Sequence, residues 1–186
     1  MVQQGMRVCL IVSALGLSGC ASLSESECRQ QRWYEVGARD GSQGRSTQYY
    51  TQHIEACSQY GIRLQLDDYQ AGYRQGLKTY CTASSGYREG ARVDEYQQVC
   101  PAELEAEFLN GYVDGLRSAA DRVESDLDSA RSKRRRLDDD LHYAKDPAKR
   151  KEIQQELDSA ESSLNSLYDQ QQTIQRLLNQ YRGRRD

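Results

Sequence analysis

The sequence is short of the aliphatic residues that usually build a protein core. Its 186 residues include 18 Leu, 5 Ile, 8 Val and 1 Phe, which together make 32 residues, or 17% of the chain. So low a fraction borders on the composition of disordered proteins. However, the formal net charge is only −3, and 13 Tyr, one Trp and six Cys are present, so the strong charge that accompanies disorder is missing. The composition excludes a large aliphatic core and predicts a fold stabilised by other means.

Long apolar runs, basic patches and catalytic motifs are also scarce. The one strongly apolar stretch lies at the very start, which excludes a multi-span membrane protein. The 25 Lys and Arg are balanced by 28 Asp and Glu, which argues against nucleic-acid binding. The chain has only two His and lacks a P-loop, a nucleophile elbow, a dinucleotide-binding glycine pattern and a zincin helix. We therefore expect no enzyme activity, no cofactor and no metal.

The N-terminus carries the most specific signal. Met1 to Arg7 are polar with one positive charge, and Val8 to Leu17 form an apolar run too short to span a bilayer, which is typical of a secretory signal. The segment ends in Leu17-Ser18-Gly19-Cys20, which resembles the bacterial lipobox. The resemblance implies that residues 1–19 are removed and that Cys20 is acylated. Two or three acyl chains on Cys20 would anchor the protein firmly in a membrane. The alternative is an ordinary signal peptide in which Cys20 is incidental.

The residue after Cys20 bears on the localisation of the protein. Ala21 follows Cys20 where some lipoproteins have Asp. By resemblance to Gram-negative lipoproteins, this implies the outer membrane, with the protein facing the periplasm.

Four cysteines remain beyond the anchor once Cys9 is removed with the signal: Cys28, Cys57, Cys81 and Cys100. An even number in an oxidising compartment predicts two disulfides. Metal ligation is the alternative, but the sequence has no CxxC pair, and only His53 lies four residues before a cysteine. Three connectivities are possible. Pairing in sequence order is mildly favoured because it closes the shortest loops.

A pentapeptide with glycine at both ends occurs four times between residues 37 and 115. Its glycines are Gly37, Gly41, Gly72, Gly76, Gly86, Gly90, Gly111 and Gly115. Each glycine inside a helix costs about 1 kcal/mol relative to alanine unless the missing side chain is used. We expect these glycines to allow one backbone to approach another. The alternatives are loop turns, above all at Gly86, and a membrane dimer face, which the intervening charged residues exclude.

Helix signals accompany the glycine motifs. Ser24 with Glu27 forms a capping box, and Asp67 and Pro101 mark the starts of two further helices as an N-cap and a first-turn proline. Strand signals are nearly absent. Residues 20–115 therefore read as a small disulfide-linked helical domain.

Residues 116–186 form a second region with heptad spacing and no cysteine. The first seam runs through Leu116, Ala120, Val123, Leu127, Ala130, Arg134, Leu137, Leu141 and Ala144, and the second through Ile153, Leu157, Ala160, Leu164, Leu167, Gln171, Ile174, Leu178 and Tyr181. Between them, Asp146-Pro147 ends one helix and starts the next. The region predicts a long antiparallel coiled-coil hairpin in a mainly α protein. Because so narrow a seam is marginal alone, we expect it to pack on a partner hairpin or on the domain of residues 20–115. Self-association or contact with another envelope protein through the hairpin is the hypothesis that follows.

Three sharper functional interpretations stand beside this one. The hairpin turn carries Lys145, Lys149, Arg150 and Lys151, which could touch an anionic envelope polymer or lipid, although an ion-paired, solvated surface is the plainer interpretation. Asp40 and Asp114 could form a glycosidase pair. Trp33 and the tyrosines could stack on sugar rings, or they could simply be the core.

Short motifs spread over the first half also resemble a known family. The matching residues are Glu27-Cys28-Arg29, Trp33-Tyr34, Gly37, Asp40-Gly41, Gly44-Arg45, His53, Ala56-Cys57, Tyr69, Gly72, Gly76-Leu77, Tyr80-Cys81-Thr82, Gly86-Tyr87, Gly90, Tyr96, Val99-Cys100-Pro101, Phe108-Leu109 and Gly111-Tyr112. With them, residues 25 to 116 resemble a family of uncharacterised bacterial lipoproteins defined by a domain of unknown function with repeated GYxxG motifs. The resemblance implies an envelope address, a Cys-linked domain and no catalysis. One departure is that residues 91–94 lack a further glycine expected after Gly90.

Together these features predict a cell-envelope lipoprotein, anchored through Cys20, with a structural or protein-interaction role. The alternative is a peptidoglycan- or carbohydrate-binding envelope module.

Overall fold

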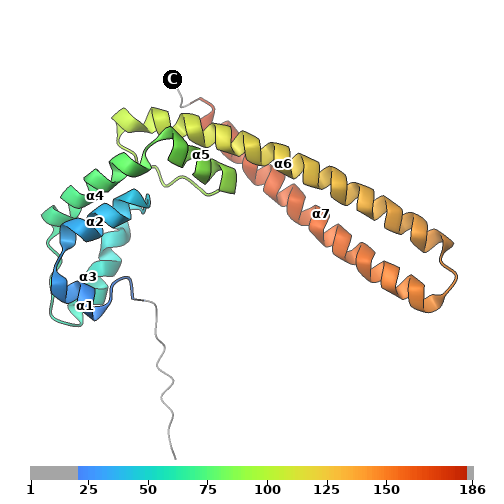
Figure 1. The fold of residues 1–186 in the computed structure, drawn as a ribbon, viewed down its shortest axis with the longest axis horizontal. Helices are drawn as coiled ribbons and strands as arrows, with labels where there is room; N and C mark the ends of the chain where they lie inside the picture. Colours follow the sequence, from blue (N-terminus) through green and yellow to red (C-terminus); the bar gives the residue numbers. More distant parts are fainter. Residues whose placement is uncertain (1–20, 184–186) are drawn as a thin grey trace, which may run out of the picture.

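The computed structural model describes residues 21–183, and the regular structure within that range is helical, without strands (Figure 1). The predicted signal segment and Cys20 therefore lie outside the described residues. The elements are α1 (Glu25–Gln30), α2 (Trp33–Ser42), the 3₁₀ turn η1 (Thr47–Tyr49), α3 (Tyr50–Ser58), α4 (Leu66–Tyr80), α5 (Ala83–Arg92), α6 (Ala102–Tyr143) and α7 (Pro147–Tyr181). A mainly α protein with a terminal helical hairpin is confirmed.

Side-chain caps explain the starts of some of the helices. Ser24 and Glu27 form the expected capping box at α1, and the Asp146 side chain accepts a hydrogen bond from the backbone N–H of Ala148 (3.0 Å) at the start of α7. Two predicted starts were wrong by a residue or two. Asp67 lies inside the first turn of α4 and caps nothing, and Pro101 is the N-cap of α6 rather than its first residue.

The eight glycines of the pentapeptides lie at two helix–helix contacts. In the first glycine unit, α2 crosses α4, and a Cβ added at Gly37 or Gly72 would collide with the carbonyl oxygen of Tyr69 or Tyr34 on the facing helix. In the second glycine unit, α5 crosses the first part of α6, and Gly86 and Gly111 meet the carbonyls of Phe108 and Ala83 in the same way. The copy at Gly86 is helical, so the loop alternative is wrong there.

The two glycine units are copies of one arrangement. Each pairs a GxxxG helix with a second GxxxG helix, and each contains a tyrosine that follows the first glycine of the second helix, Tyr73 or Tyr112. These hydroxyls donate to the backbone carbonyls of Arg45 (2.5 Å) and Asp94 (2.7 Å), each four residues after the second glycine of the first helix. The units differ in their connections, since η1 and α3 are inserted only in the first.

The two disulfides pair in sequence order, one in each unit. Cys28 bonds Cys57, which ties α1 to α3, and Cys81 bonds Cys100, which ties the junction of α4 and α5 to the segment just before α6. Around them, buried aromatic rings are as numerous as buried aliphatic side chains and are larger: Trp33, Tyr69, Tyr73, Tyr80, Tyr96, Phe108, Tyr112 and Tyr181. Aromatic packing and cross-links thus supplement a small aliphatic core.

This tyrosine core predicts loss of stability in alkali. Burial raises the pKa of Tyr73 to about 12 from its ordinary value of 10.0, and burial likewise raises the pKa values of Tyr80 and Tyr112. Because the raised pKa favours the neutral phenol in the folded state, its stabilisation is complete below pH 10 and declines as the pH rises through 10 towards 12. We expect cooperative unfolding in that window, measured by circular dichroism together with phenolate absorbance. Phenolate formation while the helices stay intact would contradict it.

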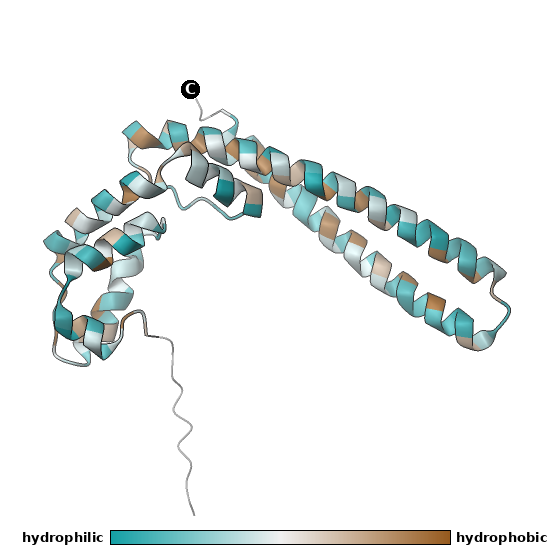
Figure 2. Cartoon of the chain, in the orientation of Figure 1, coloured by the Kyte–Doolittle hydropathy of each residue, from teal (hydrophilic) through white to brown (hydrophobic). Residues whose placement is uncertain are grey.

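The hairpin forms an arm, defined as α6 after Gly115 together with α7. Hydrophobic and hydrophilic residues alternate along both helices (Figure 2). The buried apolar side chains form two clusters, centred on Leu127 with Leu164 and on Leu137 with Ala160. The predicted seam is wrong by one position at its base. There Ala119 and Leu177 are buried where we expected Ala120 and Leu178, because the second glycine unit packs on the same helices.

The change in composition near Gly115 does not coincide with the end of a helix. Helix α6 runs without interruption for 42 residues from the second glycine unit into the arm. The end of α7 returns to that unit, where Tyr181 packs edge-on against Tyr112 with 5.3 Å between ring centroids. The composition boundary therefore falls inside one rigid helix, and the arm is joined to the domain through shared packing.

Candidate interaction sites

A buried polar cluster joins three elements of the first glycine unit. Asp40 on α2 accepts hydrogen bonds through Oδ2 from the ring Nε2 of His53 on α3 (2.7 Å) and from the Tyr69 hydroxyl on α4 (2.8 Å). On the other side of the ring, Nδ1 of His53 lies 2.8 Å from Oγ of Ser22. Asp40 and His53 are both fully buried. The cluster therefore ties the N-terminal segment, α2, α3 and α4 together.

Burial and hydrogen bonding shift the pKa of Tyr69 within this cluster. Burial, followed by the hydrogen bond to Asp40, raises the pKa of the Tyr69 hydroxyl above its ordinary range. A phenol that stays protonated remains a donor to Asp40. With Nε2–H also donating to Asp40, Nδ1 is left to accept from the Ser22 hydroxyl.

The order Ser22, His53, Asp40 matches the residue types of a hydrolytic triad but not its accessibility. A triad histidine must exchange a proton with substrate, which requires that its ring be reachable. His53 has no exposed surface, and both ring nitrogens are already engaged. The geometry instead supports a positioning role for the cluster.

Removing one donor tests that role. Tyr69→Phe should destabilise the protein by about 1 to 2 kcal/mol, because Oδ2 of Asp40 loses a partner while its other oxygen, Oδ1, already lacks a hydrogen bond. Urea unfolding of the two proteins measures the effect. Tyr143→Phe is the matched control, since Tyr143 is 78% exposed, and should change little. Equal effects of the two substitutions would argue against a structural cluster.

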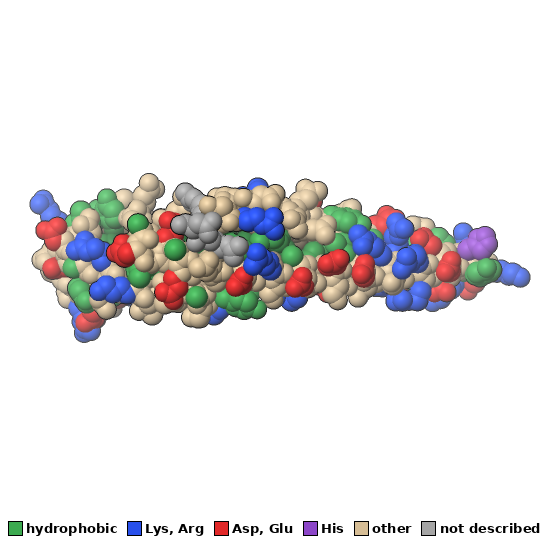
Figure 3. Space-filling view, turned by 90° about the horizontal axis from the view of Figure 1, so that it is seen from above, with side chains coloured by type: hydrophobic (Ala, Val, Ile, Leu, Met, Phe, Trp, Pro, Cys, Tyr) green, Lys and Arg blue, Asp and Glu red, His purple; other side chains and the backbone are tan. Residues whose placement is uncertain are grey.

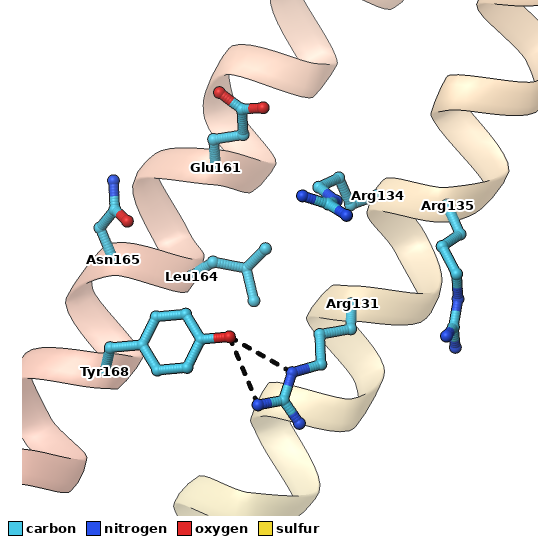
Figure 4. Close-up of a pocket in the computed structure, with 7 residues that line it drawn as sticks. All are labelled: Arg131, Arg134, Arg135, Glu161, Leu164, Asn165 and Tyr168. Atoms are coloured by element: carbon cyan, nitrogen blue, oxygen red, sulfur yellow. Dashed lines mark hydrogen bonds between the residues drawn. The ribbon is translucent and has the colours of Figure 1, made fainter.

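A second candidate lies in the middle of the arm, where the seam is interrupted by Arg134. Arg131, Arg134 and Arg135 of α6 line a cavity of about 390 Å³ with Glu161, Leu164, Asn165 and Tyr168 of α7 (Figure 4). Arg131 donates to the Tyr168 hydroxyl through Nε (3.4 Å) and Nη2 (3.3 Å). Arg131 and Arg134 also face Asp128 (3.1 Å) and Asp138 (3.8 Å). Because these guanidinium groups already have acidic neighbours, the cavity is a mixed-charge surface rather than an anion site.

The rest of the arm has the same mixed character. Blue and red side chains alternate along it in Figure 3, and the basic side chains gather towards the hairpin turn. There, Lys149 pairs with Glu152 (2.9 Å), while Arg150 donates to the backbone carbonyls of Leu141 and Ala144. Part of the predicted basic patch at the turn thus serves to close the hairpin.

The structure brings together only some of the residues that the sequence singled out. Asp40 is buried, whereas Asp114 is 60% exposed and pairs with Arg117 on α6, so the two carboxylates are not a pair around a common cleft. Trp33 is buried with 1% exposure and is unavailable for stacking on a sugar. The convergence of Ser22, His53, Asp40 and Tyr69 was missed, because it depends on how α3 folds over α2.

Within residues 21–183, no group of three or more His, Cys, Asp or Glu side chains is arranged to hold a metal ion. Over the same residues, no helix has the length and hydropathy needed to cross a bilayer.

The two glycine units coincide with a known sequence family. Residues 32–117 match the family described as protein of unknown function (DUF2799). The match thus begins just before α2 and ends just after Gly115, and it covers less than half of the chain. No curated protein and no solved structure matches the sequence. The arm lies almost wholly outside the DUF2799 match.

Proposed function

We propose that the protein is a non-enzymatic cell-envelope lipoprotein, anchored through acylated Cys20 to the outer membrane and facing the periplasm, and that its arm contacts another protein. The arm is the observation that carries this proposal. It projects from the glycine units as two long helices (Figure 1). Its apolar seam is buried between these two helices. A long, rigid, mixed-charge projection is suited to contact with another polypeptide rather than to chemistry on a small molecule.

The binding of peptidoglycan or carbohydrate is the less favoured function. Protein sites for sugars rely on aromatic faces open to the ligand, and the aromatic rings of this chain are mostly in the core. Exposed rings remain at Tyr34 (49%) and Tyr87 (44%), which lie on different glycine units, and at Tyr143 (78%) and Tyr168 (37%) on the arm. Purified sacculi provide the test, because saturable binding lost on Tyr34→Ala or Tyr87→Ala would favour this function over ours.

Metabolic labelling tests the anchor. Cells producing the full chain with radioactive palmitate should label the protein, and Cys20→Ala should abolish the label and release the protein from the membrane fraction. Cys9→Ala is the matched control and should keep the label, since Cys9 belongs to the removed signal in this proposal. A label that survives Cys20→Ala would rule out lipidation at this residue.

Photocrosslinking in intact cells tests the arm. A photoreactive amino acid at Tyr143, near the hairpin turn and 78% exposed, should give a discrete adduct with another protein. The same probe at Tyr87, 44% exposed on the second glycine unit, is the control and should not give that adduct. An adduct of twice the chain mass, with a dimer in sedimentation, would show self-association instead, and no adduct at Tyr143 would contradict the proposal.

A further inference from the structure

A strained residue lies at the end of α5. Val93 has a φ angle of +63°, in the left-handed region, where a branched side chain is especially disfavoured. The first glycine unit has a glycine at the equivalent place. Gly44 and Val93 each follow the second glycine of the first helix of their unit by three residues, and both have φ of +63°. The second unit therefore accepts a strain that the first unit avoids.

The same hydrogen bond closes this turn in both units. The backbone N–H of Gly44 donates to the carbonyl of Gly41, and that of Val93 donates to the carbonyl of Gly90, both at 3.0 Å. Glycine would satisfy the turn without strain in the second unit, as it does in the first. The reason for valine therefore lies in the contacts of its side chain.

The facing helix carries the matching difference in size. Tyr80 of α4 and Ala119 of α6 each follow the second glycine of their helix by four residues. In the first unit, the ring of Tyr80 covers Gly44 so closely that an added Cβ would collide with it. In the second unit, Ala119 is small and buried, and Val93 packs against the cluster that contains it. The first unit thus combines glycine with a large ring, and the second combines valine with alanine.

This difference leaves room for the end of α7. Ala119 lies in the same buried cluster as Ile174 of α7, so a tyrosine ring at Ala119 would compete with α7 for space. Val93 and Leu178 of α7 pack against both this cluster and the core of the glycine units. The side chain of Val93 therefore lies at the joint between the second glycine unit and the base of the arm.

We infer that Val93 is a latch that holds the end of α7, residues 174–181, on the second glycine unit. The strain at Val93 is retained because its side chain joins this unit to the arm, and the small side chain of Ala119 gives α7 the space to dock. Val93 is thus a positioning residue for the arm. The inference goes beyond the proposed function, since it concerns how the arm is held rather than what it contacts, and it holds whether or not the chain is acylated.

Hydrogen exchange with the full chain in detergent tests the latch. Val93→Gly removes both the strain and the side chain, whereas Val93→Ala removes the two methyl groups and keeps a Cβ in the left-handed region. Both should make the amides of residues 174–181 exchange about tenfold faster, because two methyl groups leave the joint. Amides near Leu137 and Ala160, in the outer part of the arm, should be unchanged.

Val99→Ala is the matched control. Val99 lies in the same connection between α5 and α6, but it packs on the core of the glycine units beside α4. It should leave the exchange of residues 174–181 unchanged. If Val93 were only a strained residue, Val93→Gly would slow this exchange or leave it as it is, and that result would overturn the inference. Equal acceleration in all regions of the chain would overturn it as well.

Exchanging the sizes between the two units tests why only the second accepts α7. Ala119→Tyr should make residues 174–181 exchange at least about tenfold faster, because the ring takes the place of α7. Full protection of these residues in Ala119→Tyr would contradict the inference.

The reverse exchange is made in the first unit. Gly44→Val should lower the urea midpoint of unfolding, since its side chain meets the ring of Tyr80. The same substitution should lower the midpoint less in a protein that already carries Tyr80→Ala. Equal effects in the two backgrounds would show that the ring and the valine do not compete for one place.

Discussion

Gly72→Ala is expected to destabilise the protein by about 2 kcal/mol, although alanine is the better helix former. Alanine in a helix gains up to about 1 kcal/mol over glycine. Against this, the new Cβ would lie inside van der Waals contact of the Tyr34 carbonyl on α2, and it would also meet the backbone N–H of Ala38 at 3.0 Å. Neither obstacle is a flexible side chain, so α2 and α4 must move apart along the whole crossing. Overpacking of this kind costs about 1 to 3 kcal/mol, occasionally more, and outweighs the helix gain.

Thermal and urea unfolding measure this effect, and the repeat supplies a second test. Gly111→Ala should act alike in the second glycine unit, since its Cβ would collide with the backbone of Ala83. Gly183→Ala is the matched control, because no atom lies within 4 Å of its added Cβ. Unchanged stability of Gly72→Ala would mean that α2 and α4 do not approach as closely as described.

Opening either disulfide should cost about 3 kcal/mol. The bond between Cys28 and Cys57 spans a sequence separation of 29 residues, and that between Cys81 and Cys100 spans 19. The chain-entropy relation gives about 3 kcal/mol for loops of this size, which is a large fraction of the total stability of a small domain. We expect Cys28→Ser with Cys57→Ser to loosen the first glycine unit while the arm remains helical.

Hydrogen exchange resolves this prediction by region. In the doubly substituted protein, amides of α1 to α4 should exchange faster, whereas those near Leu137 and Ala160 should be unchanged. The substitution of Cys81 and Cys100 should instead affect α5, the first part of α6 and the end of α7. A reduced protein with full protection in both glycine units would show that the aromatic core suffices alone.

The hairpin could be predicted from the sequence because its information is local. A heptad fixes which face of each helix is apolar, and Asp146-Pro147 fixes where the chain turns, so Leu137 and Ala160 are brought into one cluster by counting. The prediction was wrong at Ala119 and Leu177, where a third helix packs against the pair. Periodicity within two helices carries no information about that neighbour.

The glycine contacts could be predicted only in kind. The spacing of the glycines indicated that they allow two helix backbones to approach each other. However, four similar motifs can be paired in several ways. Only the fold assigns Gly37 and Gly41 to α4 rather than to α5 or α6. Asp40 illustrates the same limit. Its counterpart in the second unit, Glu89, is 22% exposed and pairs with Arg92, because no helix equivalent to α3 covers it.

The docked N-terminal segment has a mechanical consequence. Leu23 is 1% exposed in the core, and Cys20 lies only three residues before it, so an extended chain can separate the two by about 11 Å at most. A lipid on Cys20 would hold the end of the molecule with α1 and α3 against the bilayer, without a slack tether. The distance from the bilayer to the arm's tip would then be set by rigid helices, of which α6 alone spans about 63 Å. Deleting one matched heptad from each helix of the arm would shorten this spacer by about 10 Å.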